Sequence, residues 1–281
     1  MLKDDFRACR ERLENGGIEA ADFEARCLLE HVTGMNRAAQ IAHGDQSLTE
    51  AQKTLLNSLT EKRLTHYPLQ YLLGNWEFMG VSLSVGEGVL IPRDDTEVCV
   101  SLCLDYLKQK PGAKAVDLCS GSGAIALALE KLGKAEVTAV ELSDKAFYFL
   151  EKNITDNNSS ITAKKADVLS CFGDYADGSL DLIVSNPPYI PSNELAGLQA
   201  EVQFEPAMAL DGGADGLYFY REIIQNWSRK LKPGGALVFE LGEEQAEKVT
   251  EMMKQEGFSE IRTELDFGGC ERAIIGISKS M

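Results

Sequence analysis

The chain has 281 residues, of which 44% are hydrophobic, and it carries a formal net charge of −16 at pH 7. This length suits one large domain joined to a smaller one. Nucleic-acid-binding proteins neutralise phosphates with Lys and Arg, so the acidity disfavours a nucleic-acid partner and favours a protein or small-molecule substrate. No apolar run reaches the about 18 residues that a membrane helix needs. The start lacks the apolar core of a signal peptide, so a cytoplasmic protein is expected.

The cysteines and histidines do not form a metal-binding or disulfide pattern. The seven cysteines are odd in number and include no C-x-x-C pair, which disfavours a disulfide framework and a thiolate zinc site. The three histidines are scattered through the first quarter of the chain without metal-ligand spacing. We therefore expect no metal.

Residues 1–70 show helical periodicity and predict a small helical bundle. Phe6, Cys9 and Leu13 recur at helical spacing, and residues 15–17 interrupt the pattern with two glycines. Residues 47–50, Ser-Leu-Thr-Glu, form a capping-box pattern ahead of a further apolar helix. The bundle carries no catalytic constellation, so it is either a structural cap or a module that recruits a substrate.

Residues 71–92 are punctuated by glycines and predict a β-hairpin that links two domains, with strands at 76–79 and 81–84. Arg93 follows this segment and precedes an apolar helix predicted at 98–107. There it would hold either an acidic ligand or a neighbouring loop.

From residue 93 to residue 281 strand and helix patterns alternate, which predicts an α/β domain with a doubly wound, mostly parallel sheet. The predicted strands are residues 113–118, 136–142, 161–168, 180–185, 236–241 and 274–278. The predicted helices are residues 124–132, 145–153, 217–231 and 245–255.

A glycine loop separates the first of these strands from its helix. Its residues are Cys119, Ser120, Gly121, Ser122 and Gly123. Such small residues let the backbone pass close to a ligand, and the following helix N-terminus supplies N–H donors. The loop therefore predicts a binding site for a phosphate or nucleoside cofactor.

Acidic residues near the ends of the next two strands suit an adenosine. Glu141 ends the second strand, where a carboxylate accepts from both ribose hydroxyls; its other interpretation is an acid at a helix entry. Asp167 and Val168 end the third strand, where the acid either accepts from an adenine amino group or is an ordinary loop residue.

Asp117 separates two kinds of adenosine cofactor. The loop also satisfies a loose dinucleotide pattern, Gly121-x-Gly123-x-x-Ala126. An acid directly before the loop would repel a pyrophosphate but attract the cationic amino-acid end of S-adenosylmethionine. Asp117 thus favours S-adenosylmethionine over a nicotinamide cofactor, unless it only caps the loop.

Asn186, Pro187, Pro188 and Tyr189 follow the predicted strand 180–185, and we call these four residues the lip. Each proline fixes its own φ and keeps the preceding residue extended, so the lip is stiff. Its oxygen acceptors and its aromatic ring suit a planar –NH₂ group. The alternative is a Pro-Pro turn that closes the strand, with Tyr189 as ordinary packing.

Several blocks together resemble the HemK/PrmC family of class I S-adenosylmethionine-dependent protein-(glutamine-N5) methyltransferases, which act on peptide chain release factors. The blocks are residues 70–74 with Phe78, residues 90–93 with Thr96 and Glu97, the lip with residues 190–191, and residues 205–217. The resemblance implies a Rossmann-like, seven-stranded sheet, an N-terminal helical bundle at 1–70, a β-hairpin linker at 71–92 and a methyltransferase domain at 93–281. It also implies a release factor as partner, S-adenosylmethionine as cofactor, no metal and a monomer.

In this family the acceptor is the glutamine of a Gly-Gly-Gln motif, which implies roles for the lip. Asn186, Pro187 and Tyr189 would be catalytic, and all four lip residues would bind the substrate amide. The residues implied to bind the cofactor are Arg93, Asp117, Cys119, Ser120, Gly121, Ser122, Gly123, Glu141, Asp167, Val168 and Asn186. Two positions depart from the family pattern, because Cys119 replaces a glycine and Asp94 a proline. The Cβ of Cys119 is expected to crowd the methionine end.

Three other functions use parts of the same pattern. Adenine-N6 methylation of DNA or RNA uses a similar lip on an exocyclic amine, but the net charge and the lack of an aromatic-basic groove disfavour it. A nicotinamide oxidoreductase rests only on the loose glycine pattern. A non-catalytic release-factor binding module would not need both the lip and Glu141.

Overall fold

A computed structural model of the chain describes residues 1–279 and divides into two compact units. The small unit comprises Met1–Asn75 together with the segment Gln199–Phe204. The large unit holds the rest of the described chain. Among the described residues no helix combines the length and the hydropathy that a bilayer-spanning segment requires.

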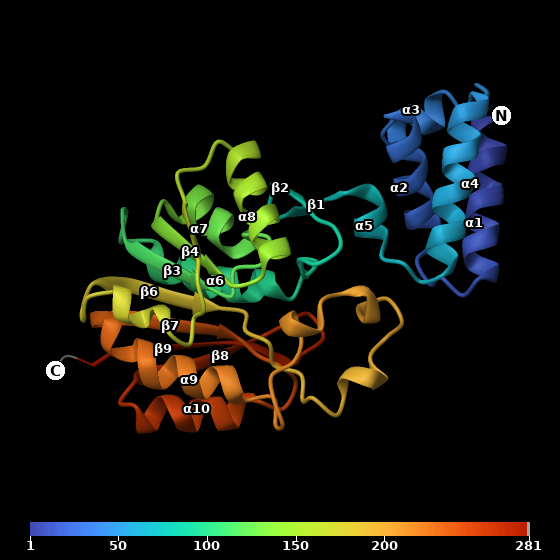
Figure 1. The fold of residues 1–281 in the computed structure, drawn as a ribbon. Coiled ribbons are helices and arrows are strands. Elements are labelled where there is room, and N and C mark those ends of the chain that lie inside the picture. The colour runs from blue at the N-terminus through green and yellow to red at the C-terminus, as the bar shows by residue number, and fades with distance from the viewer. Residues whose placement is uncertain (280–281) are drawn as a thin grey trace. The chain divides into compact units, whose positions relative to one another are not determined.

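The small unit is helical (Figure 1). Its helices are α1 (Leu2–Asn15), α2 (Ala21–Thr33), α3 (Arg37–Ala42), α4 (Glu50–Leu64) and α5 (Leu69–Leu73). Leu13, Leu28 and Leu29 are almost fully buried at its centre. Arg63 pairs inside this unit with Glu24, with Nη2–Oε1 at 2.9 Å, and with Glu201 of the returning segment.

The capping box before α4 differs from the one that the sequence predicts. Thr49 is the N-cap residue, and it exchanges hydrogen bonds with Gln52 three positions later. The prediction at residues 47–50 was wrong, because Ser47 and Glu50 match the same pattern and only the backbone shows where the first helical turn begins.

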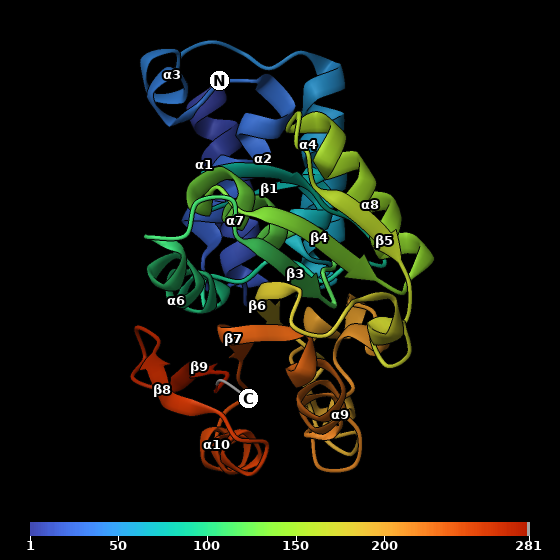
Figure 2. The same ribbon diagram turned by 90° about the vertical axis from the view of Figure 1, so that its left-hand side faces the viewer.

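The large unit is built on a seven-stranded sheet of order β5-β4-β3-β6-β7-β9-β8, which Figure 2 shows. Its strands are β3 (Lys114–Leu118), β4 (Glu136–Glu141), β5 (Thr162–Lys165), β6 (Leu180–Ser185), β7 (Leu231–Glu240), β8 (Ser259–Leu265) and β9 (Glu271–Ile277). β3 to β7 are parallel, whereas β9 runs antiparallel to β7 and β8 antiparallel to β9. A two-stranded hairpin, β1 (Asn75–Phe78) and β2 (Val81–Ser84), lies apart from this sheet.

Helices cover both faces of the sheet, because successive strand residues point to opposite sides. Ala115 of β3 packs in the cluster that includes side chains of α6 (Thr96–Leu107), α7 (Ala124–Gly133) and α8 (Asp144–Asp156). Val116 packs on the other side, with α9 (Tyr218–Trp227) and α10 (Ala246–Gln255). Figure 1 shows α7 and α8 above the strands and α9 and α10 below them.

Some boundaries differ from the sequence prediction. The strand predicted at 161–168 ends at Lys165, and the helix predicted at 217–231 ends at Trp227, followed by a short 3₁₀ turn at Ser228–Lys230. The last strand of the parallel series begins at Leu231, five residues before the predicted start, because Lys232-Pro233-Gly234-Gly235 lies inside it. The sequence pattern did not predict the strand β8.

Candidate active site

The order of the strands creates a crevice at the carboxyl ends of β3 and β6. From β3 the chain continues to β4 and β5 on one side of β3, and then returns to form β6 on the other side. The connections that follow β3 and β6 therefore run in opposite directions. Ligands of open α/β sheets bind at such a switch point. Leu118 and Ser185 are paired in register, and the Ser185 hydroxyl donates to the Leu118 carbonyl at 2.7 Å. The glycine loop and the lip therefore start side by side.

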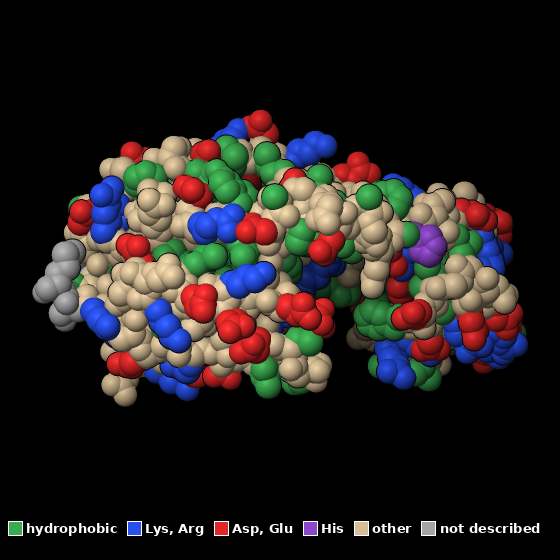
Figure 3. Space-filling model, turned by 90° about the horizontal axis from the view of Figure 1, so that it is seen from below, with side chains coloured by type: hydrophobic (Ala, Val, Ile, Leu, Met, Phe, Trp, Pro, Cys, Tyr) green, Lys and Arg blue, Asp and Glu red, His purple; other side chains and the backbone are tan. Residues whose placement is uncertain are grey.

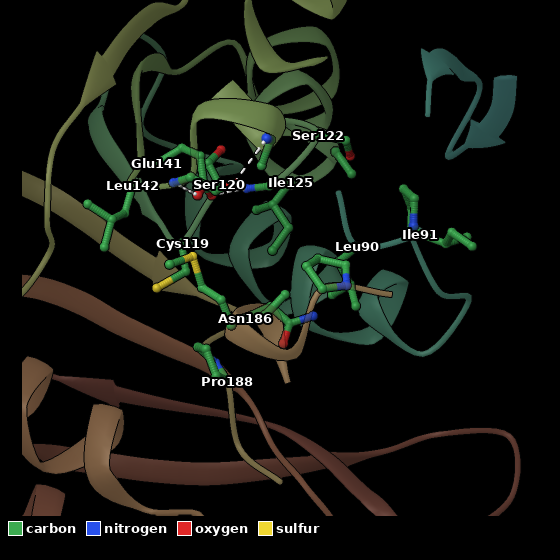
Figure 4. Close-up of a pocket in the computed structure, with 18 of the residues that line it drawn as sticks. Leu90, Ile91, Cys119, Ser120, Ser122, Ile125, Glu141, Leu142, Asn186 and Pro188 are labelled. Atoms are coloured by element: carbon green, nitrogen blue, oxygen red, sulfur yellow. Dashed lines mark hydrogen bonds between the residues drawn. The ribbon is translucent and has the colours of Figure 1, made fainter. Parts of the chain in front are cut away.

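A cavity with an empty volume of about 970 Å³, including open solvent at its mouth, lies at this crevice. Most of the residues that the sequence predicts for the site line it: Arg93, Cys119, Ser120, Gly121, Ser122, Glu141, Asp167, Val168, Asn186 and Pro188. Asp117, Gly123, Pro187 and Tyr189 do not contribute to the lining. In Figure 4 Asn186 and Pro188 face the cavity from below, and Glu141 and the loop from above.

Glu141, at the end of β4, is nearly buried and holds the glycine loop. Its Oε2 accepts from the Gly121 N–H at 2.8 Å, and its Oε1 accepts from the Ser143 N–H at 2.7 Å. Each carboxylate oxygen has further lone pairs. Glu141 therefore combines the role of a helix-entry acid with free acceptor capacity toward the cavity.

Asp117 lies beneath the loop rather than in the cavity lining. It is fully buried, and its Oδ2 accepts from the Ser120 hydroxyl at 2.6 Å and from the Ala126 N–H at 3.2 Å. Burial raises the pKa of this carboxyl to about 7, against the lowering effect of these hydrogen bonds. Its Oδ1 has no hydrogen-bond partner among the described residues. The geometry shows the loop-capping role directly.

Asp167 lies two residues beyond the end of β5, not on the strand as predicted, and it still reaches the cavity. Its Oδ1 accepts from the Leu169 N–H at 2.9 Å, which fixes the turn. Beside it Val168 is 5% exposed and supplies an apolar wall. Asp167 and Val168 thus present one polar and one apolar side chain to the cavity.

The glycine loop alternates left-handed residues. Cys119, Gly121 and Gly123 have φ values of +60°, +56° and +85°. Glycine adopts this conformation freely, whereas a residue with a Cβ is strained in it by about 1–2 kcal/mol. Cys119 is thus the strained member of the loop. Burial raises the pKa of its thiol, so it stays protonated.

Replacing Cys119 with glycine is expected to stabilise the fold by about 1 kcal/mol, because the Cβ that opposes the positive φ is removed. Cys119→Ala is the matched control, since it removes the thiol but keeps the Cβ. Thermal unfolding of the two variants measures the difference. An alanine variant that is more stable than the glycine variant would show that the backbone at residue 119 is not strained.

Arg93 lines the cavity but is already paired. Its guanidinium contacts Glu205 Oε1, while Glu205 Oε2 accepts from the Ile91 N–H at 2.9 Å. Glu205 is 6% exposed and joins two segments that are over 110 residues apart in the sequence. Of the two interpretations of Arg93, the structure shows the loop-holding one. The role of Glu205 has no local signal, although it belongs to the family-like block at 205–217.

The lip leaves β6 as the sequence predicts, with Pro187 and Pro188 buried and Asn186 partly exposed to the cavity. The Tyr189 hydroxyl donates to Glu240 Oε1 at 3.3 Å, and Tyr189 is not among the residues that line the cavity. Sequence reasoning missed Glu240, and it also missed the apolar wall formed by Leu90, Ile91, Ile125, Leu142 and Phe219.

Within residues 1–279 no three His, Cys, Asp or Glu side chains are grouped so that they could hold a metal ion. Figure 3 shows acidic and basic side chains interspersed over one face, without a continuous basic stripe.

Two domain families match the chain: PrmC N-terminal domain over residues 6–74 and Methyltransferase small domain over residues 92–208. A release factor glutamine methyltransferase of Geobacter sulfurreducens is 40% identical over 270 residues, which are 95% of this chain and 93% of the relative. The protein of the same description from Caulobacter vibrioides is 33% identical, over 98% of this chain and 96% of the relative.

Solved structures share the fold. The catalytic domain of hMettl16, in complex with a MAT2A 3′UTR hairpin, superposes with a TM-score of 0.60 at 15% identity, over 83% of this chain and 84% of that one. A methyltransferase from Pyrococcus furiosus gives 0.52 at 20% identity, over 72% of this chain and 91% of that one. The predicted class I methyltransferase fold is confirmed.

Proposed function

The chain belongs to the family of release factor glutamine methyltransferases, and from this premise we propose that it methylates the side-chain amide nitrogen of a glutamine in a peptide chain release factor, with S-adenosylmethionine as donor. The observation that carries the proposal is the pairing in register of β3 and β6, which supports it because the glycine loop and the lip start side by side. The acceptor glutamine is that of the Gly-Gly-Gln motif.

The cavity fits the adenosine and amino-acid parts of S-adenosylmethionine. Glu141 would receive the ribose hydroxyls on its free lone pairs, and Asp167 and Val168 would hold the adenine. The N-terminus of α7 follows the loop, and the left-handed Gly121 leaves open space on the side where a Cβ would stand. When bound, the cofactor supplies a methyl group on a positively charged sulfur.

The lip would orient the acceptor. An amide nitrogen is a poor nucleophile because its lone pair is delocalised into the carbonyl. The Asn186 side-chain oxygen and the Pro187 carbonyl would accept its two N–H hydrogens, which increases electron density on nitrogen and aims it into the cavity. Tyr189 would pack against the amide plane. Positioning of this kind supplies several kcal/mol of a reaction barrier. Transfer of the methyl group to a neutral amide nitrogen gives an N-methylated amide cation. This cation is a strong acid that would lose its N–H proton to water, so no general base is needed.

The small unit is proposed to recruit the release factor. We propose domain limits of 1–70 for this helical module, 71–92 for the hairpin linker and 93–281 for the catalytic domain. The partners would be release factors, with no membrane and no nucleic acid, and the enzyme would act as a monomer in the cytoplasm, where translation ends. Adenine-N6 methylation is not favoured, because the formal net charge of −16 does not suit a nucleic-acid substrate.

Mass spectrometry of a release factor after incubation with the enzyme and S-adenosylmethionine tests the proposal. We expect a gain of one methyl group on the peptide that contains Gly-Gly-Gln. A release factor with Gln→Ala at this motif should gain none. Methyl transfer to DNA or RNA in a parallel incubation, with none to the release factor, would refute the proposal and support the alternative.

A further inference from the structure

Tyr189 is held at both of its ends, by Glu240, the last residue of β7, and by Gln245, which follows β7. Its hydroxyl donates to Glu240 Oε1 at 3.3 Å, and its carbonyl accepts from Gln245 Nε2 at 2.9 Å. The Gln245 side-chain oxygen in turn accepts from the Gly242 N–H at 3.0 Å. We call Glu240, Gly242 and Gln245 the bracket.

The bracket is buried and closely fitted to the lip. Glu240 is 1% exposed and Gln245 is 8% exposed. A Cβ placed on Gly242 would lie 2.9 Å from Tyr189 Cδ2 and 2.7 Å from Gln245 Oε1, so a side chain there would force the ring or the amide to move. The position of Tyr189 therefore depends on the end of β7 and the residues that follow it, as well as on β6.

Glu240 is a buried carboxyl group whose two oxygens differ in their hydrogen bonding. Its Oε2 has no hydrogen-bond partner among the described residues. Burial of such an atom costs stability that a neutral side chain would not lose. The titratable groups that face it are Asp95, which precedes α6, Cys99 of α6, Tyr189, Tyr220 of α9 and Arg272 of β9. Burial raises the pKa of Glu240 to about 7, while the neighbouring Thr96 hydroxyl, the charge of Arg272 and the hydrogen bond from Tyr189 to Oε1 oppose the rise.

We propose that Glu240 and Gln245 are positioning residues for methyl transfer, which they assist by fixing the hydroxyl and the carbonyl of Tyr189. The inference rests on the proposed function. Pro187 and Pro188 make the lip stiff, so a shift at Tyr189 is transmitted to Asn186. A displacement of about 1 Å at a reacting group is enough to lower a rate by about 100-fold.

The bracket also makes the reaction sensitive to pH. An ionised carboxylate accepts a shorter and stronger hydrogen bond from a phenol than a neutral carboxylic acid does. Tyr189 is therefore held more firmly above about pH 7, where Glu240 is ionised. Turnover should rise through this pH range in the wild-type protein.

The test is a double-mutant cycle of Glu240→Gln and Tyr189→Phe, with kcat and KM for the release factor and Kd for S-adenosylmethionine. We expect each single change to lower kcat by about tenfold or more, and the double variant to be no slower than the worse single one. The cofactor Kd should change by less than about twofold, and Glu240→Gln should abolish the rise of kcat near pH 7. Gln245→Ala should also lower kcat.

Tyr175→Phe is the matched control, because the Tyr175 hydroxyl is buried without a hydrogen-bond partner among the described residues. It should leave kcat unchanged. The positioning role of Glu240 and Gln245 would be refuted, with the proposed function intact, if the two changes in the cycle had independent, multiplying effects on kcat. It would also be refuted if Glu240→Gln kept the wild-type kcat and pH profile. A wild-type protein that does not methylate the release factor would overturn the proposed function and this inference together.

Discussion

Asn186→Ala is expected to lower kcat for methylation of the release factor by about 10²- to 10³-fold, because removal of one oriented hydrogen-bond acceptor at a reacting group typically has this effect. Asn186 leaves β6 next to the start of the glycine loop, and its side chain reaches the cavity. The amide nitrogen of the substrate would lose both one acceptor and its alignment. Single-turnover kinetics with saturating cofactor measures the change.

The same variant should bind S-adenosylmethionine within about twofold of the wild type, since the adenosine contacts come from other strands. Asn193→Ala, at an exposed position in the segment after the lip, is the matched control and should keep wild-type kcat. If Asn186→Ala kept its turnover, the role assigned to the lip would be wrong. If it lost cofactor binding instead, Asn186 would belong to the cofactor site alone.

Glu141→Gln is expected to weaken S-adenosylmethionine binding by about 10- to 100-fold, the range that follows from losing one hydrogen bond to a charged group. Both carboxylate oxygens accept from backbone N–H groups, of Gly121 and of Ser143. A glutamine side chain satisfies only one of these donors and turns its –NH₂ group toward the other. The glycine loop would therefore shift, and the ribose would lose a charged acceptor. Isothermal titration calorimetry measures the change in Kd.

Glu136→Gln, at the exposed opposite end of the same strand, removes an equal charge and serves as the control. It should bind the cofactor like the wild type. With enough cofactor to saturate Glu141→Gln, kcat should recover to within about tenfold, since the lip is unchanged. An unaltered Kd in Glu141→Gln would show that Glu141 is only a helix-entry acid.

Local patterns were enough to place most of the strands that hold the site. The run Leu180–Ser185 matches β6 at both ends, because a short, mainly apolar run that is followed by Asn-Pro-Pro favours a strand that stops before the prolines. β8, Ser259–Leu265, escaped notice because it lies at the edge of the sheet and none of its side chains is fully buried. An edge strand such as β8 has a neighbouring strand on one side only and is less buried than a central strand. It therefore lacks the continuous apolar run that marks a central strand in the sequence.

The amino-acid sequence by itself determined the residues whose roles depend on their immediate neighbours: the glycine loop after one strand, Glu141 at the end of the next, and the lip after another. Tertiary structure alone decided that Asp117 is buried beneath the loop, that Arg93 pairs with Glu205, and that Tyr189 is anchored on Glu240. The physical reason is distance along the chain. The last two pairs are 112 and 51 residues apart, and only the order of the strands in the sheet brings such partners together.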